Sequence, residues 1–140
     1  AMISTFDGVL RVLTLGVGGI AAISLVVAGV LVMNLMLMTV RQRTPEIGLL
    51  KALGATDAQV RAIFLAEAAV LAAAGAVAGM VVGHVAIVLL AALYPAVPFA
   101  TPAWALAAAS ALALATALLF AWLPAVRAAR LEPVAALGRR

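Results

Sequence analysis

The residues with the most potential for specific chemistry are gathered in one short stretch, residues 41–57, which reads RQRTPEIGLLKALGATD. The chain has nine Lys and Arg residues and five Asp and Glu residues. Five of these fourteen charged side chains lie in this stretch: Arg41, Arg43, Glu46, Lys51 and Asp57. Charges of both signs beside leucines suit contact with another surface. We expect a helix that lies flat on a membrane or presses into a soluble partner.

Catalytic arrangements are not apparent in the sequence. There is no GxxxxGK[ST] phosphate-binding motif, no cysteine, and only one histidine, His84, so neither a nucleotide site nor a metal site is predicted. A Ser-His-Asp arrangement is not indicated either, because Asp7 and Asp57 should lie on opposite sides of a membrane. We therefore expect no enzyme activity and no cofactor bound by this chain.

Three of the polar residues inside the apolar segments could have a functional role, but for each of them we expect a structural one. We expect Glu67 to pair with an Arg or Lys near the membrane edge, although a buried acid can also mark an ion pathway. We expect His84 to be packed and hydrogen-bonded, and Asn34 to form a hydrogen bond between helices.

Composition assigns the chain to the all-α membrane proteins. It has 140 residues, of which 68% are hydrophobic and 10% charged, more apolar surface than a soluble domain of this size can bury. Three apolar segments, at residues 12–40, 62–93 and 103–123, each reach the roughly 20 residues needed to cross a bilayer. The fold class is therefore three transmembrane helices plus a short helix in the first connection.

That short helix, at residues 45–53, has recognisable ends. Thr44 is a candidate N-cap, and Pro45 fits the first helical position. Glu46 and Lys51 suit the two ends of the helix dipole, and Gly54 can adopt the left-handed conformation that ends a helix. Thr56 and Gln59 then form a capping box that predicts the start of the next helix.

Small residues recur at helical spacing in the spans. Gly75, Gly79 and Gly83 repeat every fourth residue, and this glycine stripe predicts close packing against another helix. Gly29 in the first span also favours close helix contact. Alanines at positions 105, 109, 113, 117 and 121 form a second stripe on the third span.

The positions of Lys and Arg predict the orientation. The first connection and its edges carry Arg41, Arg43, Lys51 and Arg61, whereas the N-terminal side has only Arg11 and residues 94–101 have none. The tail, residues 124–140, carries four more arginines. The positive-inside rule places the short helix and the tail in the cytoplasm and the N-terminus outside. Because the net charge of +4 lies at the span ends, nucleic-acid binding is not indicated.

Two motifs give the chain a resemblance to a known family. Residues Arg43, Thr44, Glu46, Ile47, Gly48, Gly54 and Ala55 match an Arg-Thr-x-Glu-Ile-Gly opening followed by a Gly-Ala turn. A second match comprises Pro124, Ala125, Arg127, Ala128, Ala129, Arg130, Leu131, Pro133, Val134 and Leu137. Together they resemble the FtsX-like permeases of ABC systems, which include MacB-like efflux permeases and the LolC/LolE lipoprotein-release permeases. The resemblance covers essentially the whole chain, residues 1–140, as a single transmembrane domain.

The resemblance implies a permease subunit of the bacterial inner membrane that relays ATPase movements across the membrane. The short helix would be a coupling helix gripped by a separate or fused ABC ATPase, which would bind ATP and Mg²⁺. The residues assigned to this contact are Arg43, Glu46, Ile47, Leu49, Leu50, Lys51, Leu53 and Gly54. Such permeases usually work as dimers.

Two other interpretations remain open, and one departure from the family is evident. A full permease of this kind also has an earlier membrane helix and a large extracytoplasmic domain, so we expect the chain to be a fragment or to receive those parts from another polypeptide. The first alternative is a small membrane scaffold or regulatory subunit, without a transport role, that assembles through the glycine stripe. The second is an ion or proton pathway around Glu67 and His84.

Overall fold

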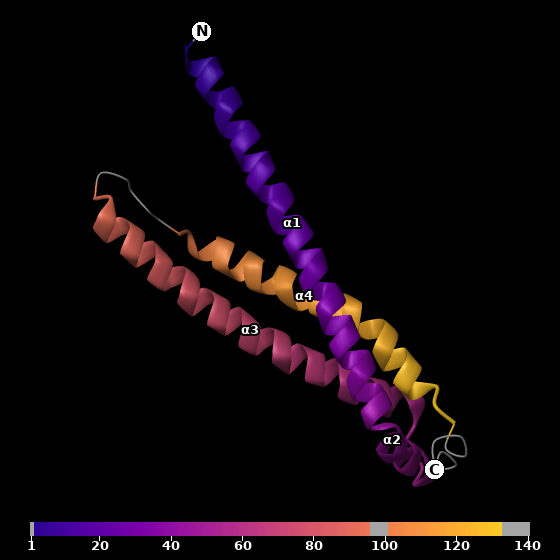
Figure 1. Cartoon of the computed structure of the whole chain (residues 1–140). Coiled ribbons are helices and arrows are strands. Elements are labelled where there is room, and N and C mark those ends of the chain that lie inside the picture. The colour runs from indigo at the N-terminus through magenta and orange to yellow at the C-terminus, as the bar shows by residue number, and fades with distance from the viewer. Residues whose placement is uncertain (1, 96–100, 133–140) are drawn as a thin grey trace.

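Four helices make up the described part of the chain. The computed structural model describes residues 2–95 and 101–132. In chain order the helices are α1 (Met2–Gln42), α2 (Thr44–Ala52), α3 (Asp57–Leu93) and α4 (Ala103–Ala129) (Figure 1). The described residues contain no strand, so the all-α prediction is confirmed.

Three of these helices are long and apolar enough to cross a membrane: Thr5–Gln42, Asp57–Leu93 and Ala103–Ala129. Each contains one of the predicted spans. Helix α1 has 41 residues and is therefore about 60 Å long at 1.5 Å per residue. Since the hydrocarbon core of a bilayer is about 30 Å thick, α1 is long enough to project well beyond it.

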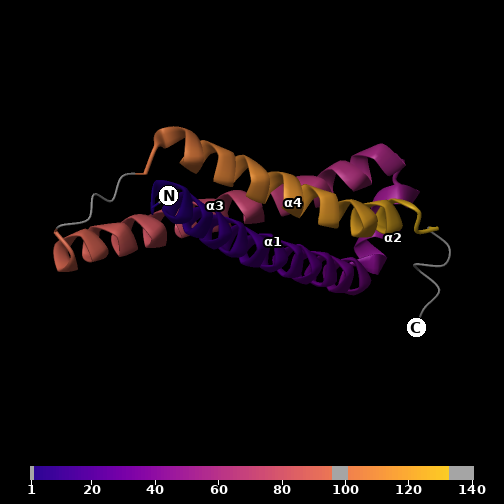
Figure 2. The ribbon, with the colours of Figure 1, turned by 90° about the horizontal axis from the view of Figure 1, so that it is seen from above.

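Helix α4 is the central element of the bundle. It packs against both α1 and α3, whereas α1 and α3 make few contacts with each other. It continues past the predicted span end at residue 123, through the buried Pro124, to Ala129. The three long helices converge where α2 lies and diverge toward their other ends (Figures 1 and 2). We call the converging part the α2 end of the bundle.

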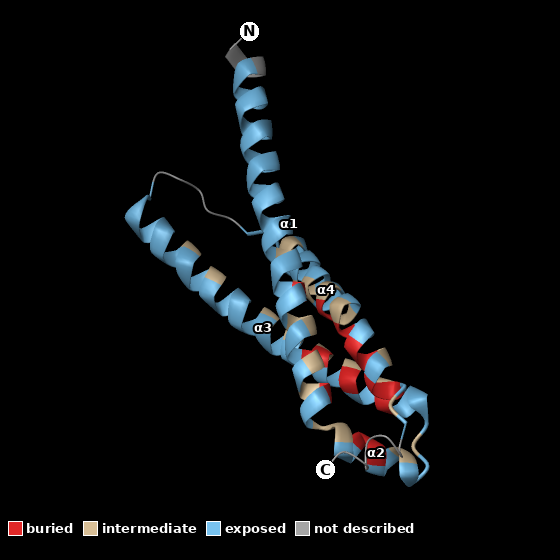
Figure 3. Ribbon diagram, turned by 45° about the vertical axis from the view of Figure 1, so that its right-hand side comes forward, coloured by how far each residue is buried: buried red, intermediate tan, exposed pale blue. Residues whose placement is uncertain are grey.

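The buried core also lies toward the α2 end (Figure 3). Its members come from all four helices: Met36, Val40, Ile47, Val60, Phe64, Ala68, Ala121, Ala125, Ala128 and Ala129. The small alanine side chains of α4 let the other helices approach its backbone closely. Of the predicted alanine stripe only Ala117 and Ala121, nearest the α2 end, are buried.

The predicted capping box is present at the start of α3. The Gln59 amide donates to Thr56 Oγ1 at 3.3 Å, and the Thr56 amide donates to Gln59 Oε1 at 2.8 Å. Three residues of the second motif, Pro133, Val134 and Leu137, lie outside the described residues.

Candidate functional site

Helix α2 forms within one residue of its predicted bounds. Pro45 lies in its first turn, with Glu46 beside it and Lys51 in its last turn. After the C-cap Leu53, Gly54 has a φ of 101°, and its amide donates to the Lys51 carbonyl at 3.0 Å. A left-handed glycine therefore turns the chain toward α3, as predicted.

The predicted N-cap role of Thr44 is wrong. Arg43 occupies the N-cap position of α2, and no side chain caps that end. The Thr44 hydroxyl instead donates to the carbonyls of Val40 at 2.9 Å and Arg41 at 3.0 Å. Because α1 runs to Gln42, its last carbonyls lie within reach of Thr44. The hydroxyl therefore satisfies the end of α1 and not the start of α2.

Arg43 joins the α1–α2 junction to α3. Its Nε lies 2.9 Å from Glu46 Oε2, its Nη1 lies 3.5 Å from Glu67 Oε2, and the guanidinium stands 6.0 Å from the centre of the Phe64 ring. The pKa of Arg43 is raised, chiefly by its hydrogen bond to Glu46; desolvation, the next largest cause, lowers it, and the charges of Glu46 and then Glu67 raise it further. The prediction that Glu67 pairs with an Arg or Lys is confirmed.

Lys51 points inward and meets two other helices. Its Nζ donates to the carbonyls of Ala129 at 2.6 Å and Leu131 at 2.9 Å, and lies 2.9 Å from Asp57 Oδ1. The side chain is only 14% exposed. One ammonium group therefore contacts the C-terminal end of α4 and the first turn of α3.

Of the residues that we assigned to ATPase contact, some are buried within this chain and others are exposed on α2. Ile47 is 3% exposed and belongs to the core, and Gly48 is buried as well. Leu49, Leu50 and Leu53 remain open, with exposed fractions of 55%, 42% and 79%. Ile47 and Lys51 are thus occupied within this chain, and the three leucines form its outward surface, which we call the leucine surface.

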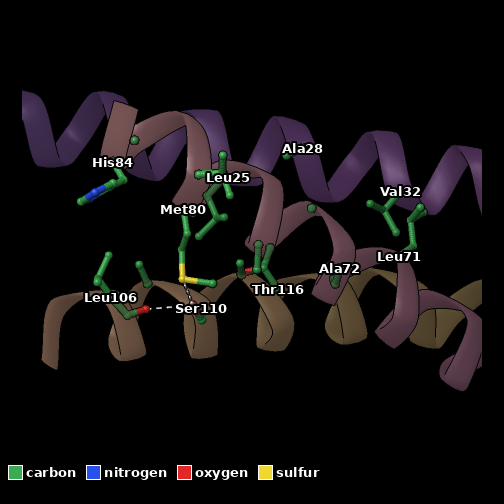
Figure 4. Close-up of a pocket in the computed structure, with 18 of the residues that line it drawn as sticks. Leu25, Ala28, Val32, Leu71, Ala72, Met80, His84, Leu106, Ser110 and Thr116 are labelled. Carbon is green, nitrogen blue, oxygen red and sulfur yellow. Dashed lines mark hydrogen bonds between the residues drawn. The ribbon is translucent and has the colours of Figure 1, made fainter. Parts of the chain in front are cut away.

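The glycine stripe faces an open cavity. Gly75, Gly79 and Gly83 have no atom within 4 Å of the position where a Cβ would stand, so no helix of the described part packs against them. They line a cavity of about 830 Å³ between α1, α3 and α4. Figure 4 shows its wall, with Ser110 of α4 hydrogen-bonded to Met80 of α3 at 3.8 Å. If the glycine stripe packs against a helix, that helix belongs to another chain segment, and this packing remains a prediction.

Gly29 is the glycine at a close contact. A Cβ there would overlap the ring of Phe120, so the absence of a side chain lets α4 lie directly on α1. The predicted close helix contact of Gly29 is confirmed. Nothing in the sequence indicates that its partner is Phe120, 91 positions later.

The expectations for His84 and Asn34 are wrong within the described residues. Both side chains are exposed, and neither forms a hydrogen bond there. His84 lines the same cavity as the glycine stripe (Figure 4). It lies 17 residues beyond Glu67 on α3, a distance of about 25 Å along a helix. These two groups therefore do not form one site.

The side chains of the described part form no candidate metal centre. No group of three or more His, Asp or Glu residues there is placed to hold a metal ion. What the arrangement offers is a short helix fixed at both ends by charged side chains, with apolar side chains turned outward.

Comparison with known proteins identifies the family. Residues 18–133 match the FtsX-like permease C-terminal family. The chain is 48% identical over 139 residues to the pyoverdine export ATP-binding/permease protein PvdT of Pseudomonas savastanoi pv. phaseolicola, covering 98% of this chain and 21% of that protein. It is 44% identical to PvdT of Pseudomonas aeruginosa, covering 99% of this chain and 20% of that protein.

The chain thus spans about one fifth of the length of these relatives. The family match covers both motifs up to Pro133, the first membrane-length helix from residue 18 onward, and the other two membrane-length helices in full. On this evidence the chain is a multi-pass membrane protein that belongs to the FtsX-like permease family.

Proposed function

We propose that this chain is the transmembrane part of an ABC transporter permease subunit, and that it relays movements of an ATPase across the membrane. The observation that carries the proposal is the leucine surface of α2, formed by Leu49, Leu50 and Leu53. Family membership supports the transporter assignment, and the relatives are described as ATP-binding/permease proteins. In this chain ATP and Mg²⁺ would be bound by the ATPase, and the permease itself would not be an enzyme.

The leucine surface is suited to docking in an apolar groove. Burial of a leucine side chain is worth about 1.5–3 kcal/mol, so three leucines supply a useful part of a docking energy. The helix that carries them lies between two membrane-length helices, and its inner side joins the core through Ile47. A force applied to the three leucines would therefore be transmitted through the core to the packed ends of all three long helices.

The distribution of charge supports the proposed orientation. The α2 end carries Arg41, Arg43, Lys51 and Arg61, so it would face the cytoplasm of a bacterium, with the N-terminus of this chain on the outer side of the inner membrane. The remaining parts of the transporter would be an earlier membrane helix, an extracytoplasmic domain and a second permease copy. Export is the direction named for the relatives, and we propose it here as well.

Site-specific photo-cross-linking tests this assignment. A photoreactive residue at Leu50 or Leu53, in the full permease, should cross-link to the ATPase, whether the ATPase is fused or separate. The control is Leu119 of α4, which is 74% exposed but lies in a membrane-length helix. Equal cross-linking from all three positions, or none from the two α2 positions, would contradict the proposal.

A further inference from the structure

The contact between Lys51 and the end of α4 links two segments that lie far apart in the sequence. Ala129 is the last residue of α4, and Leu131 follows two positions later. Their carbonyls accept hydrogen bonds from the Lys51 ammonium at 2.6 and 2.9 Å, across 78 and 80 residues of sequence. Because α4 ends here, the Ala129 carbonyl has no donor further along its own helix. Lys51 therefore caps the C-terminal end of α4, where a positive charge also suits the helix dipole.

The Lys51 side chain is more buried than the side chains that form the Arg43 ion pairs. The side chains of Arg43, Glu46 and Glu67 are 42%, 65% and 46% exposed, and such pairs contribute little because water screens them. Lys51 is 14% exposed, and two of its three partners are main-chain carbonyls. Loss of the ammonium would leave those carbonyls without their donor.

The covalent connections of α2 lead to other helices. One residue, Arg43, separates α2 from α1, and residues 53–56 connect it to α3. Helix α4 begins 51 positions after α2 ends, with α3 between them, so any direct connection between α2 and α4 is non-covalent. Among the described residues, one hydrogen bond links these two helices, and it runs from Lys51 to Ala129.

Helix α4 is well placed to distribute a displacement. It packs along both α1 and α3. Phe120 of α4 presses on Gly29 of α1, and Trp122 of α4 lies 5.4 Å from the guanidinium of Arg61 on α3, measured to the ring centre. A displacement that enters the end of α4 is therefore delivered to both other spans.

We propose that Lys51 is a positioning residue that holds α2 to the C-terminal end of α4, so that movement of α2 is passed into α4. Lys51 does not contact the ATPase in this scheme. Its role in transport rests on the proposed function, whereas the α2–α4 connection itself does not. The Asp57 carboxylate, 62% exposed, assists by holding the ammonium from the α3 side.

A distance measurement tests the connection without an ATPase. Since the described chain has no cysteine, spin labels can be placed at cysteines introduced for Ala52 of α2 and Leu123 of α4 in the full permease, with any other cysteines removed. Lys51→Met should broaden the distance distribution between these labels, and Lys51→Arg should keep it narrow. Asp57→Asn should also keep it narrow, because the two carbonyl contacts remain.

A second label pair separates positioning from general stability. Val70 of α3 and Leu123 of α4 report the packing of the long helices, away from Lys51. In Lys51→Met this pair should keep its wild-type distribution while the α2–α4 pair broadens. An unchanged α2–α4 distribution, or equal broadening of both pairs, would overturn the proposal.

Loss of the Lys51 contact should uncouple ATP hydrolysis from export. In Lys51→Met, ATP hydrolysis should stay within about two-fold of wild type, while export falls by about ten-fold or more, within the usual range of coupling between sites. Lys51→Arg should restore most of the export. Equal losses of hydrolysis and export would count against the positioning role. If Leu50→Asp left the ATPase contact intact, the proposed function would fail, but the distance result would still stand.

Discussion

The guanidinium of Arg43 lies 3.5 Å from the carboxylate of Glu67, which is 24 residues later in the chain. This ion pair ties the junction of α1 and α2 to the side of α3. It also gives the one acidic residue of the second predicted span a structural partner at the α2 end of the bundle. This pairing accounts for Glu67 as a tether between α3 and the α1–α2 junction.

Replacement of Glu67 by Gln should have a small effect. Both partners are more than 40% exposed, and exposed ion pairs contribute about 0–1 kcal/mol, so thermal unfolding of the permease in detergent should change little. We expect export to persist as well, since the pairing with Arg43 gives this carboxylate a structural role. Abolition of export in Glu67→Gln, with the melting temperature unchanged, would restore the ion-pathway interpretation.

Replacement of Leu50 by Asp should weaken the contact with the ATPase. A charge on the leucine surface replaces about 1.5–3 kcal/mol of apolar burial, which corresponds to at least about a ten-fold loss of affinity. Export, and ATP hydrolysis stimulated by the permease, should fall together. Leu50→Met is the matched control because it retains an apolar side chain of similar size. Normal stimulation by the Asp variant would show that the ATPase docks elsewhere.

Replacement of Gly29 by Ala should destabilise the bundle. The new methyl group would overlap the Phe120 ring, and such overpacking costs about 1–3 kcal/mol. Gly16→Ala is the control, since nothing lies within 4 Å of its Cβ position. Thermal unfolding should separate the two variants, and Phe120→Leu should rescue Gly29→Ala in part. Equal stability of the two glycine variants would mean that α1 and α4 are not in close contact.

Replacement of Gly79 by Leu should impair assembly and leave the fold intact. The Cβ position is open, so the larger side chain fits within this chain, but it would block a helix that packs on the glycine stripe. Cross-linking of permease copies in membranes, together with a melting curve, measures both effects. Gly19→Leu, at an open position on α1, is the control. Unimpaired assembly would remove the packing role from the stripe.

Replacement of Gly54 by Ala should strain the turn after α2. A side chain at a φ of 101° costs about 1–2 kcal/mol, so the variant should unfold at a lower temperature. Gly54→Asn should be milder, since asparagine tolerates positive φ better than alanine does. A melting temperature equal to wild type in Gly54→Ala would indicate that the turn adopts another conformation.

The features predictable from the sequence are those set by nearby residues. Pro45 and Gly54 mark the bounds of α2, and Thr56 with Gln59 marks the start of α3, because a cap depends on residues three or four positions away. Glu67 was expected to find a cation because an unpaired acid is costly in an apolar segment. The three membrane-length helices follow from hydropathy alone.

The features that could not be predicted depend on distant segments. The inward position of Lys51 depends on Ala129 and Leu131, about 80 residues away. The family resemblance assigns both Ile47 and Leu50 to the docking surface, and only the packing of α1, α3 and α4 decides which of them is buried. Thr44 fails as an N-cap because α1 continues to Gln42, so that the Thr44 hydroxyl reaches the last carbonyls of α1.

The close contact of Gly29 with Phe120 divides α1 unequally. About 20 Å of helix lies between Gly29 and the α2 end, and about 40 Å lies between Gly29 and Met2, at 1.5 Å per residue. If α1 tilts as a rigid rod with this contact as its fulcrum, the far tip moves about twice as far as the near tip, in the opposite direction. The helix would then amplify a small stroke at the α2 end into a larger excursion at its N-terminal end.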